Sequence, residues 1–365
     1  MPLSSALRES GVPLSRKISG IEGIGAGALG ALFRGGKGSM KNSISETPLL
    51  EVKRLQKYFH AKQNNGARGG EILKAVDDIS FTLRAGEALG LVGESGCGKS
   101  TTARAVLRLV EPDAGDVFYK GIDMLKLCPE EMRFLRKEMQ IIFQDPLAAL
   151  NPKRRIRDIL SEPFIIHGVT DMDFRQKSIA GLLQKTGLSE DQLARFPHEF
   201  SGGQLQRIGI ARALALNPRL IVADEPVSAL DVSIQAQIVN LLSDLKENEG
   251  IAFLFISHDM GVVEHFCDRV AVMYLGKIVE MATAQSLYAK PRHPYTLALM
   301  AAVPSLRDEV QVQKVITGEA MDTTVFAKGC AFQARCPIKE KQCEDISPTL
   351  KEIAPGHSVA CHLSE

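Results

Sequence analysis

The spacing of apolar and polar positions predicts an alternation of strands and helices. Residues 50–55 and 79–83 alternate apolar and polar side chains, as strands with one buried face do, and residues 87–92 end in an apolar run. Further strand-like runs cover 140–143, 220–223, 251–256 and 270–274, and helix-like runs cover 99–109, 172–186, 203–216 and 233–247. This alternation predicts an α/β fold with a largely parallel sheet, preceded by antiparallel strands.

The same pattern divides the chain into three regions. Residues 1–47 are rich in Ser and Gly and are expected to be a disordered tail, or to result from a start assigned too early, with Met40 as the true start. An interfacial membrane anchor is the alternative for this segment. Residues 48–290 carry the dense α/β pattern and are expected to form the main domain. Residues 291–365 are weakly patterned and are expected to form a small extension that contains cysteines.

Composition and charge limit the functional classes. The 365 residues include 44 Lys and Arg against 43 Asp and Glu, which leaves a net charge of +1 and no basic field for nucleic acid. The longest charge-free apolar stretches, 23–33 and 293–306, are shorter than the roughly 20 residues of a spanning helix. We therefore expect no nucleic-acid partner, and any membrane role to depend on other proteins.

A phosphate-binding loop is predicted at residues 93–100, whose sequence GESGCGKS matches G-x-x-x-x-G-K-[ST]. Its glycines let successive backbone N–H groups surround phosphate oxygens, and the helix that follows directs its positive end toward them. In such a loop Lys99 reaches the β- and γ-phosphates and Ser100 holds Mg²⁺. Cys97 is interpreted as a small filler residue and not as a nucleophile, because phosphoryl transfer to water needs no covalent step.

Two adjacent carboxylates provide the partner motif. Residues 220–223 form an apolar strand pattern that ends in Asp224 and Glu225. Asp224 is predicted to hold Mg²⁺ through water, and Glu225 to orient and deprotonate the attacking water beside the γ-phosphate.

A second Gly-rich helix start lies between these motifs, in the sequence FSGGQLQR at residues 200–207. It is a second anion-binding helix N-terminus in one chain. The phosphate loop and this second motif of one compact domain cannot both contact the same γ-phosphate without steric crowding. A dimer, in which Ser201 and Gly203 contact the nucleotide bound by the partner, resolves this conflict.

These motifs together resemble those of the ATP-binding-cassette (ABC) ATPases, and the resemblance covers residues 49–365. It implies a RecA-like parallel sheet with an antiparallel β subdomain and a helical subdomain. It also implies that Phe59, with Tyr58 as the alternative, stacks on adenine, and that Gln144 contacts Mg²⁺ and water and faces the transmembrane subunit. His258 matches the switch histidine near the γ-phosphate, and Asp231 ends the loop that crosses the dimer interface.

The resemblance to ABC ATPases also implies which residues bind ATP, which are catalytic and which bind Mg²⁺. The residues expected to contact ATP are Phe59, Gly93, Ser95, Gly96, Cys97, Gly98, Lys99, Ser100, Thr101, Ser201, Gly202, Gly203, Gln204 and Asp231. The expected catalytic residues are Glu225, His258 and Gln144, and the expected Mg²⁺ ligands are Ser100, Gln144 and Asp224.

A narrower resemblance concerns the sequences QDPLAALNP at 144–152 and HPYTL at 293–297, which are similar to those of dipeptide/oligopeptide permease ATPases. The phosphate loop looks most like that of their F-type subunit. This implies an ATP-hydrolysing subunit of an importer for dipeptides, oligopeptides or related solutes, peripheral on the cytoplasmic face of the inner (plasma) membrane. The implied partners are two transmembrane permease subunits, a D-type ATPase and, indirectly, an extracytoplasmic solute-binding protein.

Two other functions are alternatives for a chain with these motifs. A soluble ABC ATPase of DNA repair or translation typically carries long insertions or two cassettes, whereas residues 100–201 contain a compact segment and the chain has one cassette. A regulatory nucleotide-binding module without turnover is disfavoured by the presence of Glu225 and His258.

Four of the seven cysteines lie close together in sequence near the C-terminus, at Cys330, Cys336, Cys343 and Cys361. Structural zinc sites usually use paired C-x₂₋₄-C motifs, and these gaps are longer, so the spacing leaves an iron–sulfur cluster, zinc, or bare or paired thiols open. The permease resemblance implies that the four ligate one [4Fe–4S] cluster. It also implies ATP and Mg²⁺ as the other cofactors.

Overall fold

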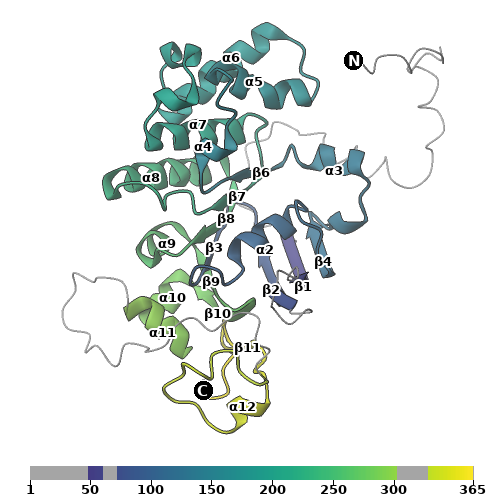
Figure 1. Cartoon of the computed structure of the whole chain (residues 1–365), viewed down its shortest axis with the longest axis vertical. Helices are drawn as coiled ribbons and strands as arrows, with labels where there is room; N and C mark the ends of the chain where they lie inside the picture. The colour runs from purple at the N-terminus through teal and green to yellow at the C-terminus, as the bar shows by residue number, and fades with distance from the viewer. Residues whose placement is uncertain (1–47, 61–71, 302–327, 365) are drawn as a thin grey trace, which may run out of the picture. The chain divides into compact units, whose positions relative to one another are not determined.

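The main sheet has eight strands in the order β11-β12-β10-β9-β3-β8-β7-β6. The computed structural model describes residues 48–60, 72–301 and 328–364, all within one compact unit, Ser45–Glu365 (Figure 1). Residues 1–47, for which a tail or an anchor was expected, lie outside the described residues. The strands of the sheet are β3 (Ala88–Val92), β6 (Met139–Ile142), β7 (Leu220–Asp224), β8 (Ala252–Ser257), β9 (Arg269–Tyr274), β10 (Lys277–Thr283), β11 (Lys351–Ala354) and β12 (His357–Val359).

The five strands β9, β3, β8, β7 and β6 are parallel, and β10, β12 and β11 extend the sheet in antiparallel fashion. The predicted parallel α/β core is therefore confirmed.

A second, antiparallel sheet has the order β2-β1-β4-β5. Its strands are β1 (Leu50–His60), β2 (Ile72–Leu83), β4 (Ala114–Tyr119) and β5 (Ile122–Asp123). Leu50 pairs with Leu83 on one side and with Tyr119 on the other, and all three side chains are buried. The alternating pattern at the start of the described chain thus forms the predicted antiparallel strands, because one of their faces packs on the core.

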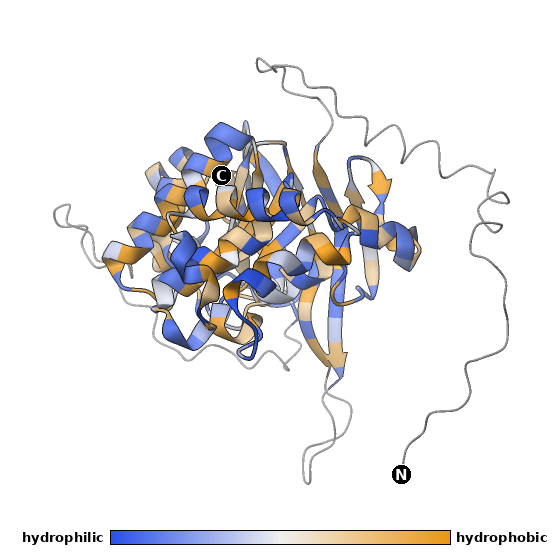
Figure 2. Ribbon diagram, turned by 90° about the horizontal axis from the view of Figure 1, so that it is seen from above, coloured by the Kyte–Doolittle hydropathy of each residue, from blue (hydrophilic) through white to orange (hydrophobic). Residues whose placement is uncertain are grey.

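The helices surround these sheets. They are α2 (Lys99–Val106), η1 (Met124–Lys126), α3 (Pro129–Leu135), α4 (Pro146–Ala149), α5 (Ile156–Ile166), α6 (Met172–Thr186), η2 (Glu190–Ala194), η3 (Pro197–Glu199), α7 (Gly202–Leu214), α8 (Val232–Glu249), α9 (Met260–Phe266), α10 (Ala284–Ala289), α11 (Pro294–Ala301) and α12 (Gln342–Asp345). Helix α2 contacts strands of both sheets, whereas α5, α6 and α7 pack on one another in a helical group (Figure 1). The longer helices carry both hydrophobic and hydrophilic residues, as helices with one buried face do (Figure 2).

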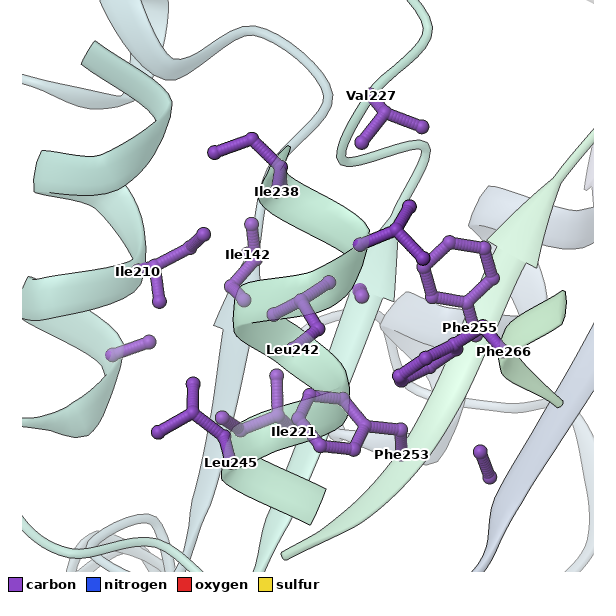
Figure 3. Packing of buried hydrophobic residues seen from close by; sticks show 14 of the residues in the cluster. Ile142, Ile210, Ile221, Val227, Ile238, Leu242, Leu245, Phe253, Phe255 and Phe266 are labelled. Atoms are coloured by element: carbon purple, nitrogen blue, oxygen red, sulfur yellow. The ribbon is translucent and has the colours of Figure 1, made fainter. Parts of the chain in front are cut away.

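The core has two layers because the central strands are buried on both faces. Ile221 of β7 and Phe253 and Phe255 of β8 point to the layer beneath α8, where they meet Leu242 and Phe266 (Figure 3). Alternate residues of the same strands enter the other layer, between the main sheet and the antiparallel sheet. Each fully buried aliphatic or aromatic side chain contributes about 1.5–3 kcal/mol, so this double burial fixes the strand ends that carry the site.

The C-terminal extension is joined to the main sheet by backbone pairing and by a buried polar cluster. Strand β12 pairs with β10, where Glu280 lies opposite Val359. The Glu280 side chain is fully buried, accepts hydrogen bonds from the backbone N–H groups of Arg292 and His293, and lies 2.7 Å from His357 Nε2. The predicted boundary at residue 290 falls between α10 and α11 and stays a prediction.

Candidate active site

The phosphate loop connects β3 to α2, as its sequence predicts, and neighbouring backbone closes around two of its glycines. Gly98 has φ +109° and precedes Lys99, the first residue of α2. A Cβ at Gly98 would lie 1.9 Å from the carbonyl oxygen of Ala75, and a Cβ at Gly93 would lie 2.2 Å from that of Met273. Both positions therefore require glycine.

A cavity of about 460 Å³ opens beside this loop. It is lined by Phe59, Leu73, Lys74, Ala75, Ser95, Gly96, Gly98, Lys99, Ser100, Thr101, Gln144, Glu225 and Gly276. Nine of these were predicted site residues, which the structure therefore brings together. Leu73, Lys74, Ala75 and Gly276 were missed, since they come from β2 and the β9–β10 turn and carry no motif. The pairing of β2 with β1 and the hydrogen bond from Asp77 N–H to Gly276 O (2.8 Å) bring these segments together, and Gly276 N–H donates to Cys97 O of the loop (2.9 Å).

The aromatic residue at the cavity is Phe59, as expected. Its side chain lies at the end of β1 and is 40% exposed. The alternative, Tyr58, donates a hydrogen bond through its hydroxyl to Asp77 (2.6 Å) and does not line the cavity. Phe59 is thus the residue free to contact a planar ligand.

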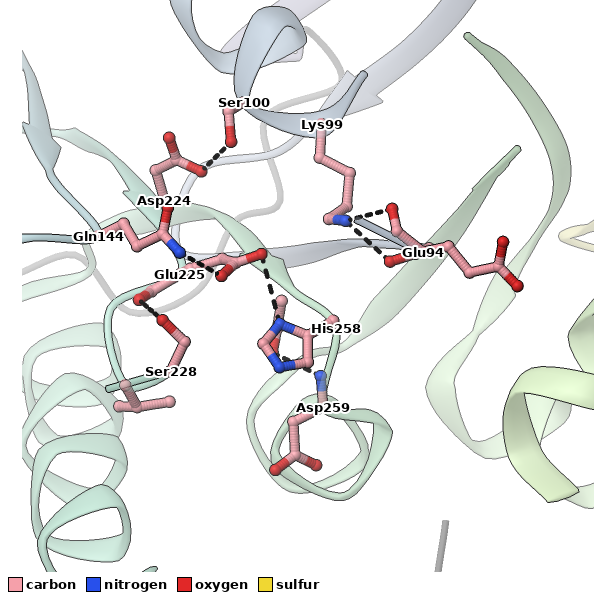
Figure 4. A network of polar contacts seen from close by, with 12 residues as sticks. Glu94, Lys99, Ser100, Gln144, Asp224, Glu225, Ser228, His258 and Asp259 are labelled. Carbon is pink, nitrogen blue, oxygen red and sulfur yellow. Dashed lines mark hydrogen bonds and ion pairs between the residues drawn. The ribbon is translucent and has the colours of Figure 1, made fainter. Parts of the chain in front are cut away.

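Lys99 is folded back on the loop backbone. Its Nζ donates to the carbonyl oxygens of Gly93 (2.8 Å) and Glu94 (2.9 Å), and the residue is 4% exposed (Figure 4). Cys97 is also buried, and burial raises the pKa of its thiol. A raised pKa disfavours the thiolate, which agrees with a filler residue rather than a nucleophile.

The two predicted carboxylates lie at the carboxyl end of β7. Asp224 accepts a hydrogen bond from Ser100 Oγ (2.8 Å) and is 2% exposed, and burial raises its pKa although this hydrogen bond lowers it. Hydroxyl and carboxylate oxygens are ligands that Mg²⁺ prefers, so the pair fits a magnesium ion.

Glu225 connects two further predicted residues. Its Oε2 accepts from Gln144 Nε2 (2.8 Å), and its Oε1 lies 3.3 Å from His258 Nδ1 (Figure 4). Glu225 has φ +48°, a left-handed conformation that costs a non-glycine residue about 1–2 kcal/mol. The backbone N–H of Glu225 donates to Ile256 O of β8 (3.0 Å), which anchors this turn. The chain therefore holds the carboxylate at one position beside the phosphate loop, between an amide and an imidazole.

The predicted residues of the second Gly-rich motif lie elsewhere. Ser201 caps α7, since Gln204 N–H donates to Ser201 Oγ and Ser201 N–H donates to Gln204 Oε1. Ser201, Gly202 and Asp231 are exposed, and neither they nor Gly203 and Gln204 line the cavity. The structure of one chain therefore does not bring these residues to the phosphate loop.

The prediction of a [4Fe–4S] cluster at Cys330, Cys336, Cys343 and Cys361 is wrong. All four thiols are free, and the described residues contain no group of three or more His, Cys, Asp or Glu side chains that could hold a metal ion. Burial raises the pKa of Cys330 and Cys336, which favours the protonated thiol of these two residues in the folded chain. The extension is held instead by the β10–β12 pairing and the Glu280–His357 contact.

Comparisons with known proteins agree with this geometry. The ABC transporter family matches residues 76–228, and the C-terminal region of the oligopeptide/dipeptide transporter family matches residues 279–343. The oligopeptide transport ATP-binding protein AppF of Bacillus subtilis is 49% identical over 325 residues, which is 88% of this chain and 99% of AppF. A putative peptide import ATP-binding protein of Brucella ovis is 48% identical over 87% of this chain and 98% of its own length. These names mention no iron–sulfur cofactor.

Solved structures show the same fold. CbiO1 from Clostridium perfringens, part of the ABC transporter complex cbiONQ, matches with TM-score 0.58 at 25% identity, over 67% of this chain and 92% of cbiO1. MJ0796, a bacterial ABC transporter cassette solved as a dimer, matches with TM-score 0.57 at 29% identity, over 64% of this chain and 98% of MJ0796.

The part of the chain that the structure describes has no helix with the length and apolar character needed to span a bilayer. The site has the phosphate loop and carboxylates of an ATP-hydrolysing cassette, and the similarity extends over almost the whole length of the curated relatives. The chain therefore belongs to the ABC transporter family, as an ABC ATPase of the oligopeptide/dipeptide transporter type.

Proposed function

We propose that this chain hydrolyses MgATP to drive the import of dipeptides, oligopeptides or related solutes. The observation that carries the proposal is the position of Glu225 beside the phosphate loop, held by Gln144 and His258. The transport names of the relatives favour this function over ATPase activity in DNA repair or translation. We assign hydrolysis to residues 48–290 and treat 291–365 as the transporter-type extension.

The residues have separate roles in the proposed reaction. Glu225 takes a proton from water as the water oxygen attacks the γ-phosphorus, and the bond to the ADP oxygen breaks. Lys99 exchanges its two backbone carbonyl partners for phosphate oxygens. Ser100, Gln144 and Asp224 would hold Mg²⁺, which supplies charge neutralisation at the phosphates. His258 orients Glu225 and the γ-phosphate.

The remaining ATP contacts are assigned to the loop and to the cavity edge. Gly93, Ser95, Gly96, Cys97, Gly98 and Thr101 surround the phosphates through backbone groups and the start of α2. Phe59, exposed at the cavity, is assigned to stacking on adenine.

We further propose that the site is completed by a second ATPase chain. Ser201, Gly202, Gly203, Gln204 and Asp231 lie away from the cavity of their own chain, and the α7 N-terminus is exposed. An exposed helix N-terminus directed at a γ-phosphate bound by the partner would stabilise its charge. We assign the partner role to a D-type ATPase.

The other proposed partners are two transmembrane permease subunits and, through them, an extracytoplasmic solute-binding protein. The proposed location is the cytoplasmic face of the inner membrane, where ATP is available, with attachment through the permease subunits. This assignment is supported by the import and transport names of the relatives.

The test is Glu225→Gln in the complex with the native partners. An amide of the same size keeps the contacts of the side chain but cannot accept the proton, so turnover should fall by about 10²–10⁴-fold while MgATP still binds. Glu247→Gln, the same change at an exposed position on α8, is the matched control and should hydrolyse at the wild-type rate. Wild-type turnover by Glu225→Gln would remove Glu225 as the base.

A further inference from the structure

We infer that Arg335 of the C-terminal extension is a positioning residue for the phosphate loop, acting through Glu94. Arg335 Nη1 donates to Glu94 Oε2 and Nη2 donates to Glu94 Oε1, both at 2.8 Å, although 241 residues separate the two in sequence. The arrangement is bidentate, the strongest and most directional form of an Arg–carboxylate pair. The Arg335 side chain is 10% exposed and that of Glu94 is 33% exposed, so the guanidinium is largely shielded from water and the carboxylate is partly shielded.

The extension presents Arg335 from a tightly held turn. Cys330 N–H donates to Cys343 O (2.8 Å), and Arg335 N–H donates to Phe332 O (3.0 Å). Phe332 is 1% exposed and packs against Tyr274 and Tyr295, with ring centroids 5.3 and 5.5 Å away. These contacts fix the turn on the main domain and fix the direction of the guanidinium.

Three groups hold Glu94, and each contacts a different part of the residue. Arg335 binds its carboxylate, the Tyr295 hydroxyl accepts from its backbone N–H (2.8 Å), and Lys99 donates to its carbonyl oxygen. When Lys99 turns to phosphate in the proposed reaction, Arg335 and Tyr295 still hold the loop. The extension therefore contributes to the shape of the loop in both situations.

Arg335 also removes an electrostatic conflict. Glu94 places a carboxylate in a loop that is proposed to bind the phosphates of ATP, and like charges repel. The guanidinium neutralises this carboxylate, so the affinity of the loop for ATP depends on the docked extension. This inference rests on the proposed function of the loop as the ATP site.

The experiment is a double-mutant cycle on the full chain with two measurements. Nucleotide affinity is measured with a fluorescent ATP analogue and Mg²⁺, and ATP hydrolysis is measured in the assembled complex. Arg335→Ala should weaken binding roughly five- to thirty-fold, the effect of one uncompensated like charge at an effective dielectric constant of about 20. KM for ATP should rise by a similar factor as the dissociation constant. The value of kcat should stay within about twofold of the wild-type value, because the groups around Glu225 are not changed. Arg335→Lys keeps the charge and should lose less affinity.

The second arm separates charge neutralisation from a purely structural role. Glu94→Gln combined with Arg335→Ala should bind within about twofold of Glu94→Gln alone, because no carboxylate is left to neutralise. Lys339→Ala, which removes an exposed ion pair with Glu344 in the same extension, is the matched control and should bind like the wild type.

Unchanged affinity in Arg335→Ala would overturn the inference. Equal loss of affinity in Arg335→Ala and in the double variant would overturn it too, because the effect would then not pass through the Glu94 charge. Equal binding by wild type and Lys99→Ala would overturn the proposed nucleotide site itself, and the inference with it.

Discussion

Acid should destabilise this protein through His293, the residue that precedes α11. Its Nδ1 accepts a hydrogen bond from Tyr295 N–H (3.1 Å), as the side chain of a helix N-cap does, so the imidazole is held as the neutral form. The ring is 1% exposed and packs 5.6 Å from the ring of Phe332. The backbone N–H of His293 donates to the Glu280 carboxylate (2.9 Å). Burial lowers the pKa of His293 to about 4.

The sign and size of the effect follow from linkage. In the unfolded chain histidine titrates near pH 6.5, so between about pH 6.5 and 4 the unfolded state binds the proton more readily than the folded state. The contribution of His293 to stability is therefore complete above pH 6.5 and is lost as the pH falls toward 4. Between pH 7.5 and 5.0 these two pKa values give a loss of about 2 kcal/mol in the free energy of unfolding.

Urea unfolding at pH 7.5 and 5.0 would measure this loss in the wild type and in His293→Asn. Asparagine is a good N-cap and its Oδ1 can accept the Tyr295 N–H, but it does not titrate. The stability difference between the two pH values should shrink by about 2 kcal/mol in this variant. His265→Asn, the same change at an exposed position of α9, should keep the wild-type difference. An undiminished difference in His293→Asn would refute the reasoning.

Two further predictions concern the ATPase machinery. Ser201→Arg places bulk and charge at the exposed start of α7. The ATPase activity of the assembled complex should fall by about tenfold or more, as it does when a group that stabilises the transition state is removed, while the chain still binds MgATP. ATPase activity equal to that of the wild type would contradict a shared site. At the left-handed position of Glu225 (φ +48°), Glu225→Gly should be more stable to urea than Glu225→Ala by about 1 kcal/mol, because both lose the same side-chain contacts and only alanine keeps the backbone cost. Equal stability of the two would mean that the turn holds no strain.

Local sequence predicted the parts of the site that a short segment builds alone. The phosphate loop is such a segment, since Gly93 and Gly98 are required by backbone that closes around them and Lys99 follows directly. The pair Asp224 and Glu225 is another, because an apolar strand buried on both faces must deliver its next polar residues at the sheet edge.

Contacts between segments that are distant in sequence could not be predicted, because no motif in the sequence marks them. Ala75 and Gly276 enter the cavity wall through strand pairing and backbone hydrogen bonds, which depend on register and not on side-chain chemistry. For the cysteines, the permease resemblance implied a cluster, whereas the described residues contain no group of three or more His, Cys, Asp or Glu side chains that could hold a metal ion. Sequence spacing shows that four cysteines lie near one another along the chain, but it does not show whether the fold brings them together as one ligand set.

The proposed dependence of the loop on Arg335 has a thermodynamic reason beyond charge. A Gly-rich loop loses more backbone freedom on ordering than other segments do, and a loop ordered only by ATP would subtract that cost from the binding free energy. Here Arg335, Tyr295 and Lys99 already hold Glu94 through its carboxylate, N–H and carbonyl groups. Of these three contacts to Glu94, only that of Lys99 is exchanged for phosphate oxygens when ATP binds. Most of the ordering therefore occurs when the chain folds, and the extension that supplies Arg335 becomes part of the preorganisation of the ATP site.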